Sequence, residues 1–376
     1  MPLAYFDNAA STKVDPRVAE AMLPYFCDKY ANPSALHAPA QECRNAIEIA
    51  RETIAELLGA DDPSEVLFTS GATEGNNTVL NSFSGKLLVS AIEHPSIRGA
   101  ALCTGRAYII PVDKTGTLDF VAYAELLKTE KPELVSVMLV NNEIGATQDI
   151  ERIGAMAHAA GARFHSDITQ GVGKRRLHLA SLSIDYATLS GHKIHAPKGI
   201  GALWVRTGAP LKQFLVGGTH EYGCRAGTSN TPCIVALGEA ARILIEEGEV
   251  ETARMKAQRT RIAKALTEQI PNMQINGQTD GAPHILSVSF RLTEGESVII
   301  NLDSEGICCT AGSACSSGGG EISPVLEAIG LSDEWVGGTV RISLSRFTTE
   351  AEIDLLIGAM VRSVTAVRNL SGFAIG

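Results

Sequence analysis

A lysine in a loop of small residues is the first group in this sequence that could act as a nucleophile. Lys193 lies in the stretch SGHKIHAPKGIG, residues 190–201, between two apolar runs that predict strands, and His192 and His195 flank it. A partly desolvated lysine has a lowered pKa and can act as a nucleophilic amine. A single loop lysine is more often solvated, so this interpretation depends on other residues.

Two further segments place polar groups directly after predicted strands. Asp167 follows the predicted strand 162–166, and Gln170 lies three residues further on. The stretch SGATEGNN, residues 70–77, opens a helix, so its small residues and Thr73 can hold a phosphate through backbone N–H groups and a hydroxyl. Taken alone, the stretch at residues 70–77 predicts only a tight strand-to-helix turn. Ligands of open α/β sheets bind beyond the carboxyl ends of strands, where these groups are expected.

A phosphate cradle, an aspartate at a strand end and a loop lysine together point to pyridoxal phosphate. This cofactor needs a lysine for its Schiff base and an aspartate that keeps its pyridine nitrogen protonated, so that the ring accepts electrons from a carbanion at the substrate Cα. His94, in SAIEHPS after the predicted strand 86–90, is placed to stack on the open face of the ring. A single histidine is usually structural, but within this set we expect a functional one.

One of the eight cysteines lies in a loop made of small residues. Cys315 belongs to TAGSACSSGGG, residues 310–320, where we expect a mobile loop and an accessible thiol. The alternative is an incidental cysteine in a small-residue loop. Cys308 and Cys309 lie in an apolar segment and are expected to belong to the core. No cysteine pair has CxxC spacing, so we expect no metal site.

Two arginines lie at the end of a predicted strand near the C-terminus, in RISLSRFTT, residues 341–349. A guanidinium at the rim of a site can bind a substrate carboxylate through two parallel hydrogen bonds. For either arginine taken alone, a surface role is the more frequent one. The pair is therefore a candidate substrate contact only as part of the wider pattern.

Apolar runs alternate with helix-like segments through most of the chain. They predict a mostly parallel sheet with strands at 65–70, 86–90, 107–112, 134–140, 162–166, 184–189 and 201–206. Beyond residue 231 the pattern predicts two long helices, 231–247 and 252–270. A smaller α+β domain is expected after them, with strands at 284–290 and 339–344 and helices near 295–303, 321–329 and 349–367. The fold class is therefore α/β.

The composition is that of a globular protein, and 376 residues suggest two or so domains. With 32 basic and 42 acidic residues the net charge is −10, which argues against binding to nucleic acid or to an anionic membrane. No apolar run approaches the ~20 residues of a membrane span, and the N-terminus lacks the pattern of a signal peptide. We expect a cytoplasmic protein.

Taken in order along the chain, these motifs resemble the cysteine desulfurases of the NifS/IscS type, in the class V aminotransferase group of fold type I pyridoxal-phosphate enzymes. The resemblance runs from YFDNAAST at residues 5–12 to RFTTEAEID at residues 346–354. The other shared motifs are ANPSALH, SGATEGNN, EHPS, VNNEIGATQDI, HSDITQGVGK, SGHKIHAPKGIGALWVR, RAGTSN, GSACSSG and SLSRFTTE.

The resemblance implies two domains and a homodimer. A large domain, residues 14–251, is implied to bind the cofactor on a mostly parallel seven-stranded sheet covered by helices. A small α+β domain, residues 1–13 and 252–376, is implied to carry the loop of Cys315. The phosphate site is implied to include Thr228 from the partner subunit, so that an active monomer would contradict this assignment.

Residue by residue, the resemblance also implies roles in the site. Asp167 pairs with the pyridine nitrogen and Gln170 with the phenolic oxygen, while Asn142 and Arg346 orient the substrate carboxylate. The full set implied to bind the cofactor is Ala72, Thr73, His94, Asp167, Gln170, Ser190, His192, Lys193 and Thr228.

The implied reaction removes sulfur from L-cysteine. Lys193, displaced from the cofactor by the substrate amine, removes the Cα proton, and His94 stacks on the ring and moves protons. The thiolate of Cys315 then attacks the substrate sulfur, which leaves a persulfide on Cys315 and releases L-alanine. The persulfide passes to an acceptor protein, either an iron–sulfur scaffold or another sulfur carrier.

The loop GGTHEYGCRAGT, residues 217–228, departs from the family pattern in several positions, including Cys224. We hypothesise that Cys224 takes a relayed sulfur. Two enzymes of the same fold remain alternatives, a selenocysteine lyase and a small-amino-acid aminotransferase, and the aminotransferase would not need Cys315. A sulfur carrier without catalysis is a further alternative, and the presence of Lys193 argues against it.

Overall fold

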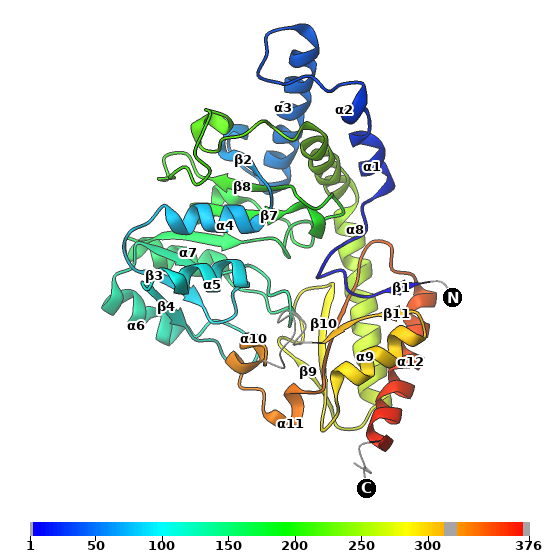
Figure 1. Cartoon of the computed structure of the whole chain (residues 1–376). Helices are drawn as coiled ribbons and strands as arrows, with labels where there is room; N and C mark the ends of the chain where they lie inside the picture. Colours follow the sequence, from blue (N-terminus) through cyan, green and yellow to red (C-terminus); the bar gives the residue numbers. More distant parts are fainter. Residues whose placement is uncertain (1–2, 312–321, 371–376) are drawn as a thin grey trace.

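The computed structural model describes residues 3–311 and 322–370, and its largest sheet has seven strands in the order β2-β8-β7-β6-β5-β3-β4 (Figure 1). These are β2 (Val66–Thr69), β3 (Leu87–Ser90), β4 (Ala107–Ile110), β5 (Leu134–Ser136), β6 (Arg163–Asp167), β7 (Tyr186–Ser190) and β8 (Gly201–Val205). Strand β8 runs antiparallel to β2 and β7, and the other neighbours are parallel. The predicted α/β class and the mostly parallel seven-stranded sheet are confirmed.

Strand β5 is shorter than the predicted strand 134–140, but the chain continues beside β6. The backbone N–H of Val137 donates to the carbonyl of His165 at 3.1 Å, and that of Leu139 donates to the carbonyl of Asp167 at 2.9 Å. This segment therefore follows β6 to its carboxyl end, where Asp167 lies.

The helices that cover the sheet begin and end at ordinary capping residues. The carboxylates of Asp119 and Asp149 accept backbone N–H groups at the starts of α6 (Phe120–Glu130) and α7 (Ile150–Ala159). Gly59, with φ of 62°, ends α3 (Ala38–Leu58) in the left-handed conformation. The remaining elements of this part are α1 (Pro16–Met22), α2 (Pro24–Cys27), α4 (Ala72–Asn81), α5 (Pro95–Cys103), η1 (Pro63–Glu65), η2 (Leu179–Ser181), η3 (Gly191–Lys193) and η4 (Glu221–Gly223).

One helix, α8 (Thr231–Gln269), replaces the two helices predicted at 231–247 and 252–270. Gly248 lies where a break was expected, but an interior glycine costs only about 1 kcal/mol relative to alanine and does not stop a helix. Residues of the first half, such as Leu237, pack in the core of the large sheet, whereas those of the second half, such as Ile262, pack in a second core. Figure 1 shows α8 extending across both parts of the molecule.

The second core is built on an antiparallel sheet in the order β12-β13-β10-β9. Its strands are β9 (Met273–Asn276), β10 (Ile285–Phe290), β12 (Thr310–Ala311) and β13 (Thr339–Ser343), of which β9 and β12 were not predicted. The N-terminal strand β1 (Ala4–Tyr5) pairs in parallel with β11 (Ile307–Cys308), so the N-terminus packs on this part. Helices α9 (Gly295–Ser304) and α12 (Glu350–Leu370) pack in this core, whereas α10 (Pro324–Ala328) and the end of α11 (Asp333–Val336) pack in a separate cluster with Ile92 and Ile144.

Within residues 3–311 and 322–370, no helix combines the length and the apolar character that crossing a membrane requires.

Candidate active site

Asp167 lies buried at the carboxyl end of β6 and accepts a hydrogen bond on each carboxylate oxygen. Its Oδ2 accepts from Nδ2 of Asn76 at 3.0 Å, and its Oδ1 accepts from the backbone N–H of Thr169 at 3.0 Å. A carboxylate offers about four acceptor positions. Asp167 can therefore take a further donor from a ligand above the strand end.

Lys193 closes the short helix η3 after β7, and the N-terminal segment holds its ammonium group. Nζ donates to the carbonyl oxygens of Ala9 and Ala10 at 2.7 and 2.6 Å. Two hydrogen bonds to the same loop come from Thr12, whose backbone N–H and hydroxyl both donate to the carbonyl of His192 at 2.9 Å. The segment after β1 thus reaches across from the second core to the lysine.

The N-terminus of α4 forms the third part of this site. The helix begins after Gly71, and no side chain caps its first turn. Ser190, at the end of β7, faces this turn, because its Oγ lies 3.5 Å from a Cβ built on Gly71. A Cβ on Gly201 would lie 2.7 Å from the Cα of Gly71, so glycine is required for this close approach. Ala72 is buried and Thr73 is exposed, and the free N–H groups here suit an anion such as phosphate.

His94 precedes α5 and acts as its N-cap. Its Nδ1 accepts the backbone N–H of Ser96 at 3.1 Å and lies 2.8 Å from Oγ of Ser96. Burial lowers the pKa of His94, and the charges of Asp167 and Lys193 act on it in opposite directions. The structure therefore brings these three predicted residues into one site.

His192 and Gln170 lie in the same region. Burial lowers the pKa of His192 to about 4, with Lys193 and Lys198 adding to the effect, so its imidazole is neutral at neutral pH. Gln170 is buried, its Nε2 donates to the carbonyl of Ala9 at 3.0 Å, and its Oε1 lies 3.0 Å from Nε2 of His284. Both predicted residues thus lie beside the lysine.

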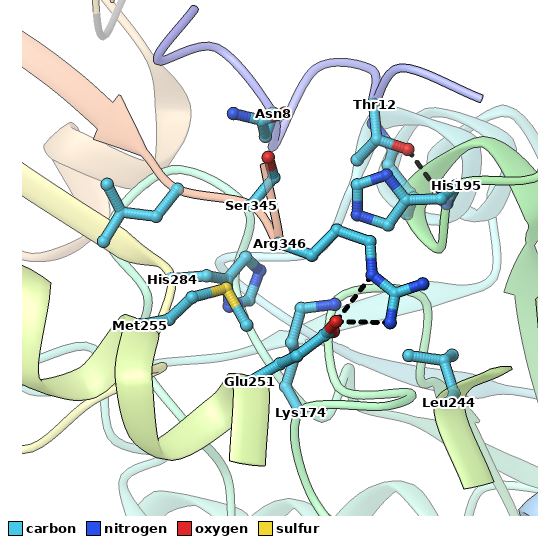
Figure 2. Close-up of a pocket in the computed structure, with 12 residues that line it drawn as sticks. Asn8, Thr12, Lys174, His195, Leu244, Glu251, Met255, His284, Ser345 and Arg346 are labelled. Atoms are coloured by element: carbon cyan, nitrogen blue, oxygen red, sulfur yellow. Dashed lines mark hydrogen bonds and ion pairs between the residues drawn. The ribbon is translucent and has the colours of Figure 1, made fainter. Parts of the chain in front are cut away.

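Arg346, predicted to orient the substrate carboxylate, is paired with carboxylates of the chain itself. Nε donates to Glu251 at 2.7 Å, Nη1 to Asp15 at 3.0 Å and Nη2 to Glu247 at 3.0 Å. Figure 2 shows Arg346 and Glu251 pointing toward each other beside Lys174. The Arg346 side chain is only 5% exposed, so this cluster joins the segment after β13 to α8 and to the N-terminal region. These contacts support a structural role for Arg346.

We expect Arg346→Ala to lower the free energy of unfolding by about 3 kcal/mol, because Asp15 and Glu251 lose a buried cation. Urea unfolding followed by circular dichroism measures this. Arg242→Ala, which removes two exposed ion pairs from α8, is the matched control and should cost less than about 1 kcal/mol. Equal stability of the two variants would contradict a structural role.

Arg341, in β13, is the arginine that lies beside Asn142. Its Nη1 donates to the carbonyl of Asn142 at 3.0 Å, and its Nη2 donates to Asp7 at 2.7 Å. Its Nε is buried and has no hydrogen-bond partner among the residues that the structure describes. Arg341 is thus a buried cation with one unused hydrogen-bond donor, its Nε.

Thr228 lies exposed in the loop between η4 and α8. Two ion pairs hold η4 and this loop to helices beside the large sheet: Arg225 pairs with Glu74 of α4 at 3.0 Å, and Glu221 pairs with Arg51 of α3 at 2.8 Å. The loop is therefore anchored close to the N-terminus of α4, while Thr228 faces outward from this chain.

The thiols differ in their surroundings. Cys315, the predicted sulfur acceptor, lies outside the described residues. Cys224 is half-buried against an apolar cluster that includes Leu67 and Leu203, and burial raises the pKa of its thiol. A raised thiol pKa disfavours the nucleophilic thiolate, which argues against the hypothesis of a sulfur relay through Cys224. Burial also raises the pKa of Cys309, which packs against the second core, as expected for a core residue.

Several neighbours of the site were not singled out from the sequence. Asn76 donates to Asp167, and its position one helical turn after Ala72 in SGATEGNN could have indicated a side chain that faces the sheet. His284 contacts Gln170 but lies in APHILS, which carries no chemical signal.

Three comparisons place this geometry among known proteins. The model of the family described as Aminotransferase class-V matches residues 4–356. A cysteine desulfurase of Nostoc sp. is 41% identical, in an alignment that covers 99% of this chain and 96% of the relative. The cysteine desulfurase IscS of Salmonella arizonae is also 41% identical, in an alignment that covers 98% of this chain and 94% of the relative. A solved NifS-like protein from Rickettsia africae superposes with a TM-score of 0.90 at 32% identity, over 96% of this chain and 99% of its own.

Proposed function

The chain belongs to the cysteine desulfurases of the class-V aminotransferase family, and from this membership we propose which of its residues carry the reaction. It is a pyridoxal-phosphate enzyme that takes sulfur from L-cysteine, releases L-alanine and delivers the sulfur to an acceptor. The observation that carries the assignment of residues is the convergence of Asp167, His94 and Lys193 beside the uncapped N-terminus of α4.

The residues present fit pyridoxal phosphate. Asp167 keeps acceptor capacity for a protonated pyridine nitrogen, Lys193 supplies an amine, and Ser190 faces the free N–H groups of α4 for a phosphate. Ala72, Thr73, His94, Gln170, His192 and the partner subunit's Thr228 complete the proposed set. When bound, the cofactor supplies an electron sink for a carbanion at the substrate Cα.

The chain's own residues would hold and move the protons. Lys193 removes the Cα proton, because its amine is the base beside the site, and the N-terminal carbonyls of Ala9 and Ala10 hold it in place. Asp167, held by its two hydrogen bonds, would fix the ring nitrogen. His94, whose pKa is lowered by burial, would lie against the ring of the bound cofactor and would move protons through its imidazole.

We propose that Arg341, rather than Arg346, binds the substrate carboxylate together with Asn142. The guanidinium of Arg346 is engaged by three carboxylates, whereas Arg341 contacts Asn142 directly and has an unpartnered Nε. A buried cation whose donors are incompletely used is suited to a ligand carboxylate.

Arg341→Gln is therefore expected to raise KM for L-cysteine about 100-fold, which corresponds to roughly 3 kcal/mol of binding. Steady-state alanine formation over a range of L-cysteine concentrations measures this. Arg346→Gln serves as the matched variant, and we expect it to lower stability with little change in KM. A KM effect confined to Arg346→Gln would restore the original assignment.

We propose that the sulfur is held as a persulfide on Cys315 before it reaches an iron–sulfur scaffold or another carrier protein. Equal amounts of alanine and sulfide from L-cysteine with a reductant would test this function. A strong preference for selenocysteine would favour a lyase, and keto-acid formation would favour an aminotransferase.

We also propose a homodimer in which Thr228 completes the partner's phosphate site. The outward exposure of Thr228 and the ion pairs that hold its loop support this arrangement. Light scattering during size-exclusion chromatography tests it, and an active monomer would contradict it.

The proposed domains remain residues 14–251, and residues 1–13 together with 252–376, and the two separate cores support this division. The free thiols of all seven described cysteines support a reducing compartment such as the cytoplasm.

A further inference from the structure

Asn76 joins two parts of the candidate site through hydrogen bonds of one side chain. It lies on α4, is fully buried, and its Nδ2 donates both to Oδ2 of Asp167 at 3.0 Å and to Oγ of Ser96 at 2.8 Å. Its Oδ1 accepts from the hydroxyl of Thr188, on β7, at 2.5 Å. The amide therefore uses both of its protons and its oxygen inside the protein.

The chemistry of the partners determines how this amide is oriented. The carboxylate of Asp167 can only accept, so the NH₂ group of Asn76 must face it and the oxygen must face Thr188. Thr188 gives its single proton to Asn76, and its oxygen can then accept from Nε2 of His165, which is 3.3 Å away. Nδ1 of His165 in turn lies 2.8 Å from the hydroxyl of Ser136 and accepts from it. Every member of this buried chain has a matching partner.

The same reasoning determines which nitrogen of His94 carries the proton. Because Oγ of Ser96 accepts from Asn76, its own proton is available for Nδ1 of His94 at 2.8 Å. The backbone N–H of Ser96 also donates to Nδ1. With two donors at Nδ1, a neutral imidazole carries its proton on Nε2.

We propose that Asn76 is a positioning residue: its uncharged amide holds the carboxylate of Asp167 and the hydroxyl of Ser96 beside His94 without adding a second charge to the site. The inference rests on the proposed function, in which Asp167 and His94 contact the cofactor. Asparagine is required because an aspartate of the same shape would place a second carboxylate against Asp167, and two such groups share one proton. Asp167 would then hold the charge only part of the time.

Asn76→Asp and Asn81→Asp form a matched pair of variants on α4. Asn81 is exposed, and its Nδ2 donates to the carbonyl of Asn77 at 2.8 Å, so its replacement adds the same charge away from the site. The holoenzymes are compared by the ¹⁵N chemical shift of the pyridine nitrogen, with labelled pyridoxal phosphate, and by steady-state kinetics. For Asn76→Asp we expect an unprotonated pyridine nitrogen and a kcat lowered at least about 100-fold, with KM changed less than about threefold. Asn81→Asp should match the wild type.

Asn76→Ala removes the hydrogen bonds without adding charge and covers the case in which Asn76→Asp does not fold. Here we expect the pyridine nitrogen to stay protonated and His94 to keep its Nε2–H tautomer, because the backbone N–H of Ser96 still donates to Nδ1, and we expect kcat to fall less than in Asn76→Asp. A protonated pyridine nitrogen and near wild-type kcat in Asn76→Asp, or an unprotonated pyridine nitrogen in Asn76→Ala, would overturn the inference. If the wild type itself lacks a protonated pyridine nitrogen or forms no alanine from L-cysteine, the proposed function fails instead.

Discussion

Lys193→Ala is expected to lower kcat for alanine formation by about 10⁴-fold, because one substitution removes both the proposed covalent anchor of the cofactor and the proposed base at the substrate Cα. The hydrogen bonds of Nζ to the carbonyls of Ala9 and Ala10 place this amine at the rim of β7, within electrostatic reach of His94. Steady-state kinetics, with the cofactor content of each preparation measured by absorbance, gives the effect.

Lys198→Ala is the matched control for this prediction, since it removes an exposed lysine from the same loop. We expect it to keep kcat within about threefold of the wild type, as for an ordinary surface substitution. If Lys193→Ala kept a tenth of the wild-type kcat at full cofactor content, Lys193 would not be the base.

Cys315→Ala is expected to lower the release of sulfide and alanine from L-cysteine together, by at least about 1,000-fold. The thiolate of Cys315 is the proposed nucleophile toward the substrate sulfur, and without it the carbon–sulfur bond has no acceptor for its sulfur. Quantifying both products in the same reaction measures the effect. Cys103→Ala, which removes an exposed thiol from the end of α5, is the control and should leave both products unchanged.

Formation of alanine or a keto acid that survives Cys315→Ala would leave the cofactor site standing. It would favour the aminotransferase or lyase alternative and would show that Cys315 takes no part in the reaction.

The large sheet could be predicted because buried parallel strands are continuous apolar runs, which stand out against amphipathic helices. The continuity of α8 could not be predicted, since Gly248 and its acidic neighbours give the local pattern of a break between two helices. The helix continues because its two halves are held by different cores, and that is a property of the tertiary structure. Strand β9 was missed because MQIN is short and half polar.

Within the site, the groups that were predicted are those at the ends of strands, such as Asp167 and Lys193. Spacing could not distinguish Arg341 from Arg346, because the carboxylates that engage Arg346 come from distant parts of the chain. The role of Asn76 was not predicted, for a similar reason. Its three side-chain partners lie on other elements, and only the fold shows that one amide donates to both Asp167 and Ser96.

The most direct test of the account is to locate the sulfur after a single turnover. The holoenzyme is mixed with one equivalent of L-cysteine in the absence of reductant, trapped with an alkylating agent, and mapped by peptide mass spectrometry. We expect one additional sulfur atom on the peptide that contains Cys315, together with one equivalent of L-alanine. Alanine without added sulfur on Cys315, or sulfur carried only by another cysteine such as Cys224, would contradict the proposed desulfurase mechanism.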